Sequence, residues 1–443
     1  MNSHAFSISG CGPISRANIR LHGITVLAGE NGSGKSTVAR WLNASLFVMN
    51  RYEQLVEEDG KRAVADKLRN LTRALPFGAE EFSGLRSKLE DIYYSDSSVN
   101  KMPFPELVEF YMSSVQEFCD AMLFRSSDAS SLDNEFHYDT RRINAFFGVR
   151  AKKDEEYAET VGRLRRRLES DVNEIVTETE KKKTERTANN FSVYMTRLLS
   201  AEEASSRSVE IGFSEDGQNL MLDDFKMPLA ISRAIYLDTR KLCDYLKPRF
   251  AGYIDNLLRK QSPAPLSKET RMLIRALQFT IGGDVNYKSQ PVRKGTEVFR
   301  FVTPEGLDIP LQNAATGVIS FSILLRLLQN GWLDDSTMLI IDEPEGHLHP
   351  QWIVEYARLL VRLHKHLGVK VMVSSHNPDM VAAIQSISRK EKVLDRTLFY
   401  LAERDDKEGM PTYHTKDLGH EIGEIFDSFN IALDRIGQYG QEE

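Results

Sequence analysis

Hydrophobic and polar residues alternate near the start of the chain and predict short β-strands there. The alternation runs through AFSISG (5–10) and again through ANIRLHGITVLAG (17–29). Period-two patterning of this kind is typical of strands with one buried face. The residues that follow, STVARWLNASLFVM (36–49), have the three-to-four spacing of a helix. The glycine-rich stretch AGENGSGKST (28–37) therefore lies between a predicted strand and a predicted helix.

The middle of the chain has a different pattern, because strand signals fade and apolar residues recur at three and four. Phe104–Leu123 reads as one amphipathic helix and Lys152–Arg186 as a longer one, on the order of 50 Å at about 1.5 Å per residue. The longer helix carries a narrow apolar seam typical of a short coiled coil. The seam residues are Tyr157, Val161, Leu164, Leu168, Val172 and Ile175. We predict that residues 46–205 form a helical insertion.

Strand patterns return after the insertion and alternate with helical stretches. The predicted strands are 208–213, 230–238, 297–311, 337–344 and 369–376, and the main helical stretches are 318–331 and 350–368. Alternating strands and helices indicate an α/β fold whose largely parallel sheet is covered on both faces. Residues 1–45 and 206–443 are then one domain, in which the first strands pair with strands nearly three hundred residues later.

Composition and charge restrict the class of protein further. With 443 residues, 41% apolar and 27% charged, the chain has the composition of a globular protein of two or three units. No stretch reaches the apolar length of a membrane span, and MNSHAFSISG lacks the pattern of a signal peptide, so we expect a cytoplasmic protein. Cys11, Cys119 and Cys243 form no CxxC pair, which argues against disulfides and a zinc site. The net charge of −7 restricts any nucleic-acid contact to local basic patches.

The glycine-rich stretch fits the phosphate-binding pattern GxxxxGK[ST] in full. Its glycines let backbone N–H groups turn toward phosphates, and the following helix contributes its positive end. We expect Lys35 to reach the β- and γ-phosphates of ATP, Ser36 to ligate Mg²⁺ and Thr37 to bind the α-phosphate. A glycine-rich turn that binds nothing is the alternative. The expected ATP-binding residues are Gly29, Glu30, Asn31, Gly32, Ser33, Gly34, Lys35, Ser36 and Thr37.

A second motif, MLIIDEPEGHLHP (338–350), places two carboxylates at the end of an apolar strand. At the carboxyl edge of a sheet, Asp342 would hold Mg²⁺ and Glu343 would orient and deprotonate the attacking water. An acidic turn after a core strand is the alternative. His347 and His349 lie on the turn into the next helix, where packing or contacts between subunits are favoured over metal binding.

Two further stretches extend this pattern. VMVSSHNPD (371–379) delivers His376 at the end of another apolar run, where it could hydrogen-bond the γ-phosphate and distinguish ATP from ADP. LQNAATG (311–317) heads an apolar helix, and taken alone it predicts a helix cap at Thr316.

The motifs GENGSGKST, NAATG, LIIDEPEGHLHP and SSHNPD together resemble the ABC-type ATPase heads of SMC, RecF and OLD proteins. They are most similar to the stand-alone AAA-type ATPases of the Septu, PARIS and retron anti-phage systems. The resemblance covers residues 1–45 and about 206–443 and departs from the LSGGQ signature of transporters. It implies that Thr316 and Gly317, with Asn313 nearby, contact the γ-phosphate bound by a second subunit. Catalysis would then depend on Lys35, Glu343 and His376 in an ATP- and Mg²⁺-dependent homo-oligomer.

Three functional hypotheses follow from the resemblance and the motifs. The favoured one is an ATPase that controls a separately encoded effector such as a nuclease, because the segment after His376 carries no DxD cluster of an OLD-type nuclease. A RecF-like ATPase acting directly on DNA is the main alternative, and an ATP-dependent scaffold with negligible turnover is the other. The basic runs Arg163–Arg167 and Lys181–Lys183 could bind phosphate backbones, but interleaved acids are typical of a solvated helix face.

Overall fold

The computed structural model describes most of the chain in two compact units. The sheet unit comprises residues 1–50 and 187–443, and the helical unit comprises residues 51–186. The predicted insertion, residues 46–205, begins before the helical unit and ends after it. The described residues are 3–76, 79–94, 101–127, 143, 145–149, 156–199, 209–222, 224–246, 253–289, 297–405 and 411–428.

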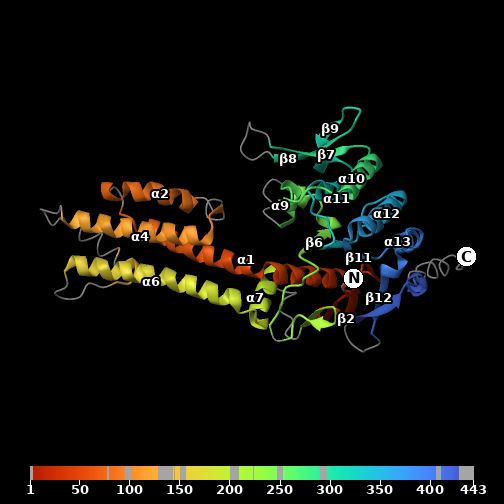
Figure 1. The fold of residues 1–443 in the computed structure, drawn as a ribbon, viewed down its shortest axis with the longest axis horizontal. Helices are drawn as coiled ribbons and strands as arrows, with labels where there is room; N and C mark the ends of the chain where they lie inside the picture. Colours follow the sequence, from red (N-terminus) through yellow and green to blue (C-terminus); the bar gives the residue numbers. More distant parts are fainter. Residues whose placement is uncertain are drawn as a thin grey trace, which may run out of the picture. The chain divides into compact units, whose positions relative to one another are not determined.

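A mixed sheet, ten-stranded within the described ranges, organises the sheet unit (Figure 1). Its central strands are mutually parallel, while β1 pairs antiparallel with both β2 and β4. In spatial order the strands are β5 (Gln218–Asn219), β4 (Glu210–Glu215), β1 (His4–Cys11), β2 (Ile14–Leu21), β13 (Tyr413–Gly419), β12 (Thr397–Arg404), β3 (Ile24–Ala28), β11 (Lys370–Ser375), β10 (Thr337–Asp342) and β6 (Arg233–Asp238).

The expectation of a largely parallel sheet therefore holds for the central strands and for β13 with β2, but not for the pairs β1–β2, β1–β4, β4–β5 and β12–β13. Gly12 and Pro13 join β1 to β2 in a two-residue turn, a connection that only antiparallel neighbours can have. The expected strand over 297–311 is also wrong in detail. It bends at Gly306, whose φ is +94°, into β8 (Glu297–Val302) and β9 (Asp308–Pro310). These two pair with β7 (Asp284–Ser289) in a separate small antiparallel sheet.

Register brings the carboxyl ends of the central strands to one edge. Ala28 at the end of β3 pairs with Ser375 at the end of β11. Asp342 at the end of β10 pairs with Ser374 on one side and with Asp238 on the other. The segments that follow these strands therefore lie side by side at this edge. The predicted pairing of β3 with a late strand is confirmed, at a separation of 347 residues (Ile24 with Val371) rather than nearly three hundred.

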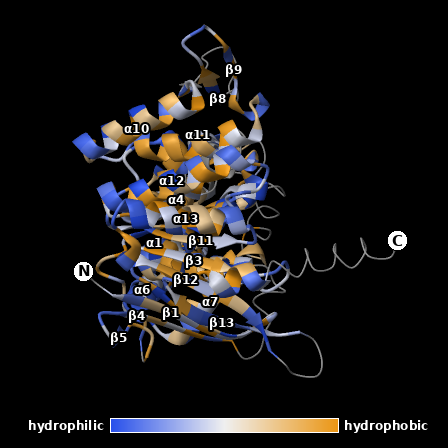
Figure 2. Ribbon diagram, turned by 90° about the vertical axis from the view of Figure 1, so that its right-hand side faces the viewer, coloured by the Kyte–Doolittle hydropathy of each residue, from blue (hydrophilic) through white to orange (hydrophobic). Residues whose placement is uncertain are grey.

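Helices cover the sheet and supply most of the core. One face of the central strands packs against an extensive apolar cluster that includes Ile24, Val26, Ile341 and Val373. Figure 2 colours the central strands mainly as hydrophobic. After the start of α1 (Lys35–Ala74), the α-helices with described bounds in this unit are α7 (Ala188–Leu198), α9 (Tyr253–Arg259), α10 (Lys268–Ile281), α11 (Thr316–Gln329), α12 (Pro350–Leu367) and α13 (Pro378–Lys390).

α12 shows how the local sequence sets the limits of an element. The side chain of His349 caps its start by accepting a hydrogen bond from Gln351 N, and Pro350 occupies the first turn, where no backbone donor is lost. Gly368 ends the helix in the left-handed conformation with φ +72°. The cap predicted at Thr316 is wrong, because Thr316 already has the first helical position of α11 and Ala315 precedes it without a side-chain cap.

The helical unit is built from the later part of α1 (Lys35–Ala74) and from α2 (Ser83–Tyr94), α4 (Phe104–Ser127) and α6 (Tyr157–Thr184), with the short η1 (Glu80–Phe82). Four of the predicted seam residues, Val161, Leu164, Leu168 and Val172, are at most 3% exposed, and the other two pack against the same core. The expected helices are confirmed to within a few residues, although residues 152–155 lie outside the described ranges. None of the helices in the described parts of the chain is long and apolar enough to cross a bilayer.

Candidate functional site

The phosphate-binding motif forms a tight loop between β3 and α1. Gly29, Gly32 and Gly34 have φ values of +153°, +83° and +86°, a region that side chains with a Cβ rarely adopt. A Cβ on Gly34 would lie 2.4 Å from Ile14 Cδ1, so the loop also needs glycine for space. Glycine at these three positions therefore specifies the backbone of the loop. This backbone leads directly into the N–H groups at the start of α1.

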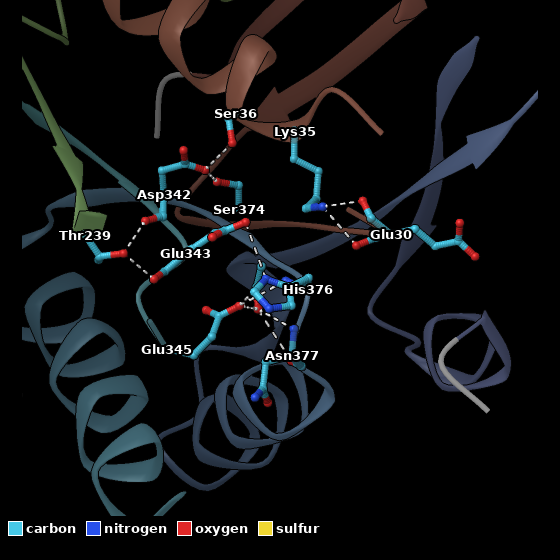
Figure 3. A network of polar contacts seen from close by, with 12 residues as sticks. Glu30, Lys35, Ser36, Thr239, Asp342, Glu343, Glu345, Ser374, His376 and Asn377 are labelled. Carbon is cyan, nitrogen blue, oxygen red and sulfur yellow. Dashed lines mark hydrogen bonds and ion pairs between the residues drawn. The ribbon is translucent and has the colours of Figure 1, made fainter. Parts of the chain in front are cut away.

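Lys35 is folded back onto the loop that contains it. Its Nζ donates to the carbonyl oxygens of Gly29 (2.9 Å) and Glu30 (2.7 Å), and the residue is only 4% exposed (Figure 3). Burial lowers the pKa of Lys35, while the charges of Glu343 and Asp342 act in the opposite direction. The result is a desolvated cation that faces carboxylates, held only by neutral oxygens.

Asp342 is joined to the loop by a hydrogen bond. Ser36 Oγ donates to Asp342 Oδ1 at 3.0 Å, although the two residues are 306 positions apart. Ser374 donates to the same oxygen, and Tyr236 OH donates to Oδ2 at 3.1 Å. The two predicted Mg²⁺ ligands, Ser36 and Asp342, therefore present hydroxyl and carboxylate oxygens to one position, and such hard oxygen ligands are what Mg²⁺ prefers.

Glu343 adopts a backbone conformation that is uncommon for a residue other than glycine, with φ +53°. Its N–H donates to Ser374 O at 2.8 Å, and Thr239 Oγ1 donates to its carbonyl oxygen at 2.7 Å. These two contacts fix the turn at which β10 ends. Its carboxylate lies 3.4 Å (Oε1) from His376 Nδ1, so the two predicted catalytic residues are neighbours.

Glu345 is a site residue that the sequence reasoning missed. It is 6% exposed, and its Oε1 accepts from Ser375 Oγ (2.7 Å) and from His376 N (3.0 Å), with His376 Nδ1 at 3.4 Å. Its Oε2 has no hydrogen-bond partner among the described residues. Burial raises the pKa of Glu345. His376 therefore lies between two carboxylates, and Figure 3 shows its ring between Glu343 and Glu345.

A second missed group comes from β6 and the turn after it. Arg240 pairs with Asp238 at 2.9 Å and lies 3.5 Å from Asp342 Oδ2. Burial raises the pKa of the Tyr236 hydroxyl, which therefore stays a hydrogen-bond donor to Asp342 at neutral pH. The expected strand over 230–238 could have indicated this group, because its parallel pairing with β10 places its end beside Asp342.

The three residues expected to act in trans lie together at one helix start. Asn313 ends the short η4 (Leu311–Asn313), and Thr316 and Gly317 open α11. A Cβ on Gly317 would lie 3.3 Å from Leu348 Cδ2 and 3.5 Å from Trp352 Cε3. The described residues show no hydrogen bond or ion pair from these three to the phosphate loop, so the structure does not bring them into the site of their own chain.

His347 and His349 have places in the turn before α12 and at its cap. His347 adopts φ +62° in the turn, and His349 serves as the cap of α12. Across the described ranges, no group of three or more His, Cys, Asp or Glu side chains is arranged to hold a metal ion.

Several cations of the basic runs in the helical unit pair with acids of the same helix. Arg165 bonds Glu169 at 2.7 Å, and Lys182 lies 2.5 Å from Glu178. Lys183 lies 2.9 Å from Glu180. These pairs fit a solvated helix face, as the interleaved charges predict.

Comparison with known proteins gives the class. Residues 4–381 match the family described as AAA ATPase domain, and the chain belongs to this family. The match includes the helical unit and ends five residues after His376. Membership confirms the predicted P-loop ATPase class, whereas the kinship to anti-phage ATPases stays a prediction.

Individual relatives are more distant. The energy-coupling factor transporter ATP-binding protein EcfA2 of Clostridium perfringens is 35% identical over 72 residues, which are 16% of this chain and 25% of that protein. The chain thus spans a quarter of the length of this relative. An Smc head domain of Pyrococcus yayanosii is 11% identical, covering 98% of this chain and all of that one, with a TM-score of 0.36. An Smc head bound to the C-winged helix domain of ScpA is 11% identical over 94% and 97%, with a TM-score of 0.37. Scores of this size do not establish a shared structure.

Proposed function

We propose that the chain binds Mg·ATP at the carboxyl edge of the central strands and hydrolyses it. The observation that carries this proposal is the convergence, at one edge, of the phosphate loop with the ends of β10 and β11. Lys35, Ser36, Asp342, Glu343 and His376 all lie there (Figure 3). The buried Lys35 ammonium fits a phosphate, and the oxygens of Ser36 and Asp342 fit a divalent cation, so both expected groups suit the residues present.

Each residue has a role that follows from its contacts. Lys35 would exchange its loop carbonyls for the β- and γ-phosphates, while Ser36 and Asp342 would hold Mg²⁺. When bound, Mg²⁺ neutralises charge on the phosphate oxygens. Glu343, fixed by its backbone contacts, would orient a water molecule and accept its proton. His376, held between two carboxylates, would donate a hydrogen bond to the γ-phosphate.

The ATP site is completed by a second copy of the chain in this proposal. The start of α11 has no side-chain cap, so its backbone N–H groups are available to an anion. Thr316 and Gly317, with Asn313, would present them to the γ-phosphate bound by the partner. ATP would then promote a dimer or a higher homo-oligomer, and hydrolysis would release it.

The resemblance of the motifs supports a role for this cycle in anti-phage defence, in the cytoplasm. Association and release of subunits would control a separately encoded effector such as a nuclease, and the helical unit would recognise the trigger or the partner. Co-purification of the tagged chain from its own host tests this part: a nuclease recovered in an ATP-dependent manner supports it. Recovery of replication or repair proteins instead contradicts it.

The central experiment replaces Glu343 by Gln, which keeps the size of the side chain and removes the base. We expect ATP turnover to fall at least about 10²-fold while binding of a fluorescent ATP analogue persists. Glu355→Gln, on the exposed side of α12, is the matched control and should leave turnover unchanged. Equal turnover in the Glu343→Gln protein would overturn the catalytic assignment.

Two outcomes would redirect the proposal. DNA-stimulated turnover that needs no partner and falls when Arg163–Arg167 is neutralised would favour a RecF-like ATPase. A wild-type protein that assembles with ATP but does not hydrolyse it would favour a scaffold.

A further inference from the structure

A second polar cavity lies at the opposite edge of the central sheet, where the parallel strands begin. It has a volume of about 450 Å³. Its lining combines the turn before β3, the starts of β11 and β12, the segments before β6 and β10, and the end of α12. Because the phosphate loop follows the carboxyl ends of these same strands, this cavity is separate from the ATP site.

The lining is rich in cationic side chains. His22, His364, Lys365, Lys370 and Arg396 line it, and Asp335 is the one carboxylate residue in the described lining. Lys365 is already paired with Glu391 at 2.5 Å, and the one ion pair of Arg396 among the described residues is with its exposed neighbour Asp395 at 3.8 Å.

Lys370 is the central cation of this lining. Its Nζ donates to the backbone oxygens of Asp335 (2.6 Å) and Ala230 (3.3 Å), and within the described ranges no carboxylate forms an ion pair with it. Burial lowers the pKa of Lys370, while the charges of Asp335, Glu215 and Asp334 act in the opposite direction. An ammonium held by neutral oxygens in a pocket is the arrangement that Lys35 has in the phosphate loop.

His364 adds a second buried group. It is 5% exposed, and its Nδ1 donates to Val369 O at 3.0 Å, which leaves Nε2 without a hydrogen-bond partner among the described residues. Burial lowers the pKa of His364, and the neighbouring charges of Arg396, Lys370 and His22 lower it further. A bound anion would offset the positive charges of Lys370 and Arg396 beside this ring.

We propose that this cavity is a second anion site, which takes a small phosphorylated molecule and uses Lys370 and Arg396 as its main ligands. A volume of about 450 Å³ lies within the range of small-molecule pockets, which supports a free molecule over a long polymer. The phosphate chemistry follows from several basic donors that line one cavity in which Asp335 is the one carboxylate of the described lining. The proposal does not depend on ATP hydrolysis.

Inorganic pyrophosphate is the probe, measured by isothermal titration calorimetry on the full-length Lys35→Ala protein, in which the phosphate loop lacks its cation. We expect saturable binding that weakens by about tenfold or more on adding Lys370→Met, and likewise on adding Arg396→Gln. Lys390→Met, on the exposed end of α13, is the matched control and should change nothing.

Three results would overturn the proposal. The first is no binding to the Lys35→Ala protein, and the second is binding that neither added change weakens. The third is tighter binding of a 5′-phosphorylated oligonucleotide than of pyrophosphate, which would assign the cavity to a nucleic-acid end. Arg396 is partly exposed, so its replacement gives a folded test protein if the Lys370 change disturbs β11, and thermal denaturation checks both.

Discussion

Glu345 offers the sharpest test of how the site is held in place. Replacing it by Ala removes the acceptor for two buried donors, Ser375 Oγ–H and the backbone N–H of His376. A buried donor left without a partner costs about 1–3 kcal/mol, so leaving both donors without this acceptor should lower the free energy of unfolding by about 2–6 kcal/mol. The His376 ring also loses its neighbour at 3.4 Å, so we expect turnover to fall as well.

Glu345→Gln is the informative partner of this change. The amide keeps an oxygen where Oε1 stands, and therefore keeps both hydrogen bonds, but it removes the charge. Urea denaturation followed by circular dichroism should place Glu345→Gln within about 1 kcal/mol of wild type and well above Glu345→Ala. Equal destabilisation of the two variants, or an unchanged free energy of unfolding in Glu345→Ala, would contradict a role for the Glu345 Oε1 hydrogen bonds in stabilising the end of β11.

The same pair of proteins should diverge with pH. Burial raises the pKa of Glu345 above its ordinary value of 4.5, so the folded state binds the proton more tightly than the unfolded state. The stabilising contribution of this carboxyl is therefore complete below about pH 4.5 and is lost as pH rises through the raised value. Glu345→Gln has no such loss, and its stability relative to wild type should increase from pH 4.5 to pH 8. A difference that is constant with pH would contradict the assignment of the shift.

Three further predictions follow from backbone and packing. Gly34→Ala, which would place a Cβ 2.4 Å from Ile14 Cδ1, should abolish binding of a fluorescent ATP analogue. The control Gly217→Ala, with φ +79° and no atom within 4 Å of the added Cβ, should leave this binding unchanged. Retained binding in Gly34→Ala would be inconsistent with the loop geometry. Gly317→Glu should abolish hydrolysis while leaving ATP binding by the loop largely intact, and normal turnover would argue against a site shared between subunits. Leu164→Ala should lower the unfolding free energy by about 2–5 kcal/mol in urea denaturation, because Leu164 is fully buried in the helical unit; a loss below 1 kcal/mol would refute its place in that core.

The phosphate loop and the strand ends could be predicted from the sequence because their signals are local. GxxxxGK[ST] requires glycine conformations that few other structures need, and an apolar run that ends in Asp342 and Glu343 indicates a buried strand with its acids at the sheet edge. The juxtaposition of Ser36 with Asp342 then follows from parallel pairing alone.

Glu345 and Tyr236 could not be found in the same way. Nothing in DEPEGHLHP distinguishes a buried Glu345 from a solvated one, since its burial depends on β11 and His376, which come some thirty residues later. Tyr236 reaches Asp342 from β6 across about a hundred residues of sequence. Likewise, β4 pairs with β1 over some two hundred residues of sequence, a contact that no local pattern specifies.

The position of β3 between β11 and β12 also determines when the nucleotide site can form during translation. Both hydrogen-bonding neighbours of the strand that carries the phosphate loop are made roughly 350 residues after it. At about 5–20 residues per second a ribosome needs on the order of 20–70 s to deliver them. Residues 51–186 form a compact unit of their own and can fold during that interval. The backbone N–H and C=O groups of β3 stay without their pairing strands until β11 and β12 have been made. A nascent chain would therefore gain its nucleotide site only after β12 has been made, which leaves β3 as the segment that a chaperone would have to shield.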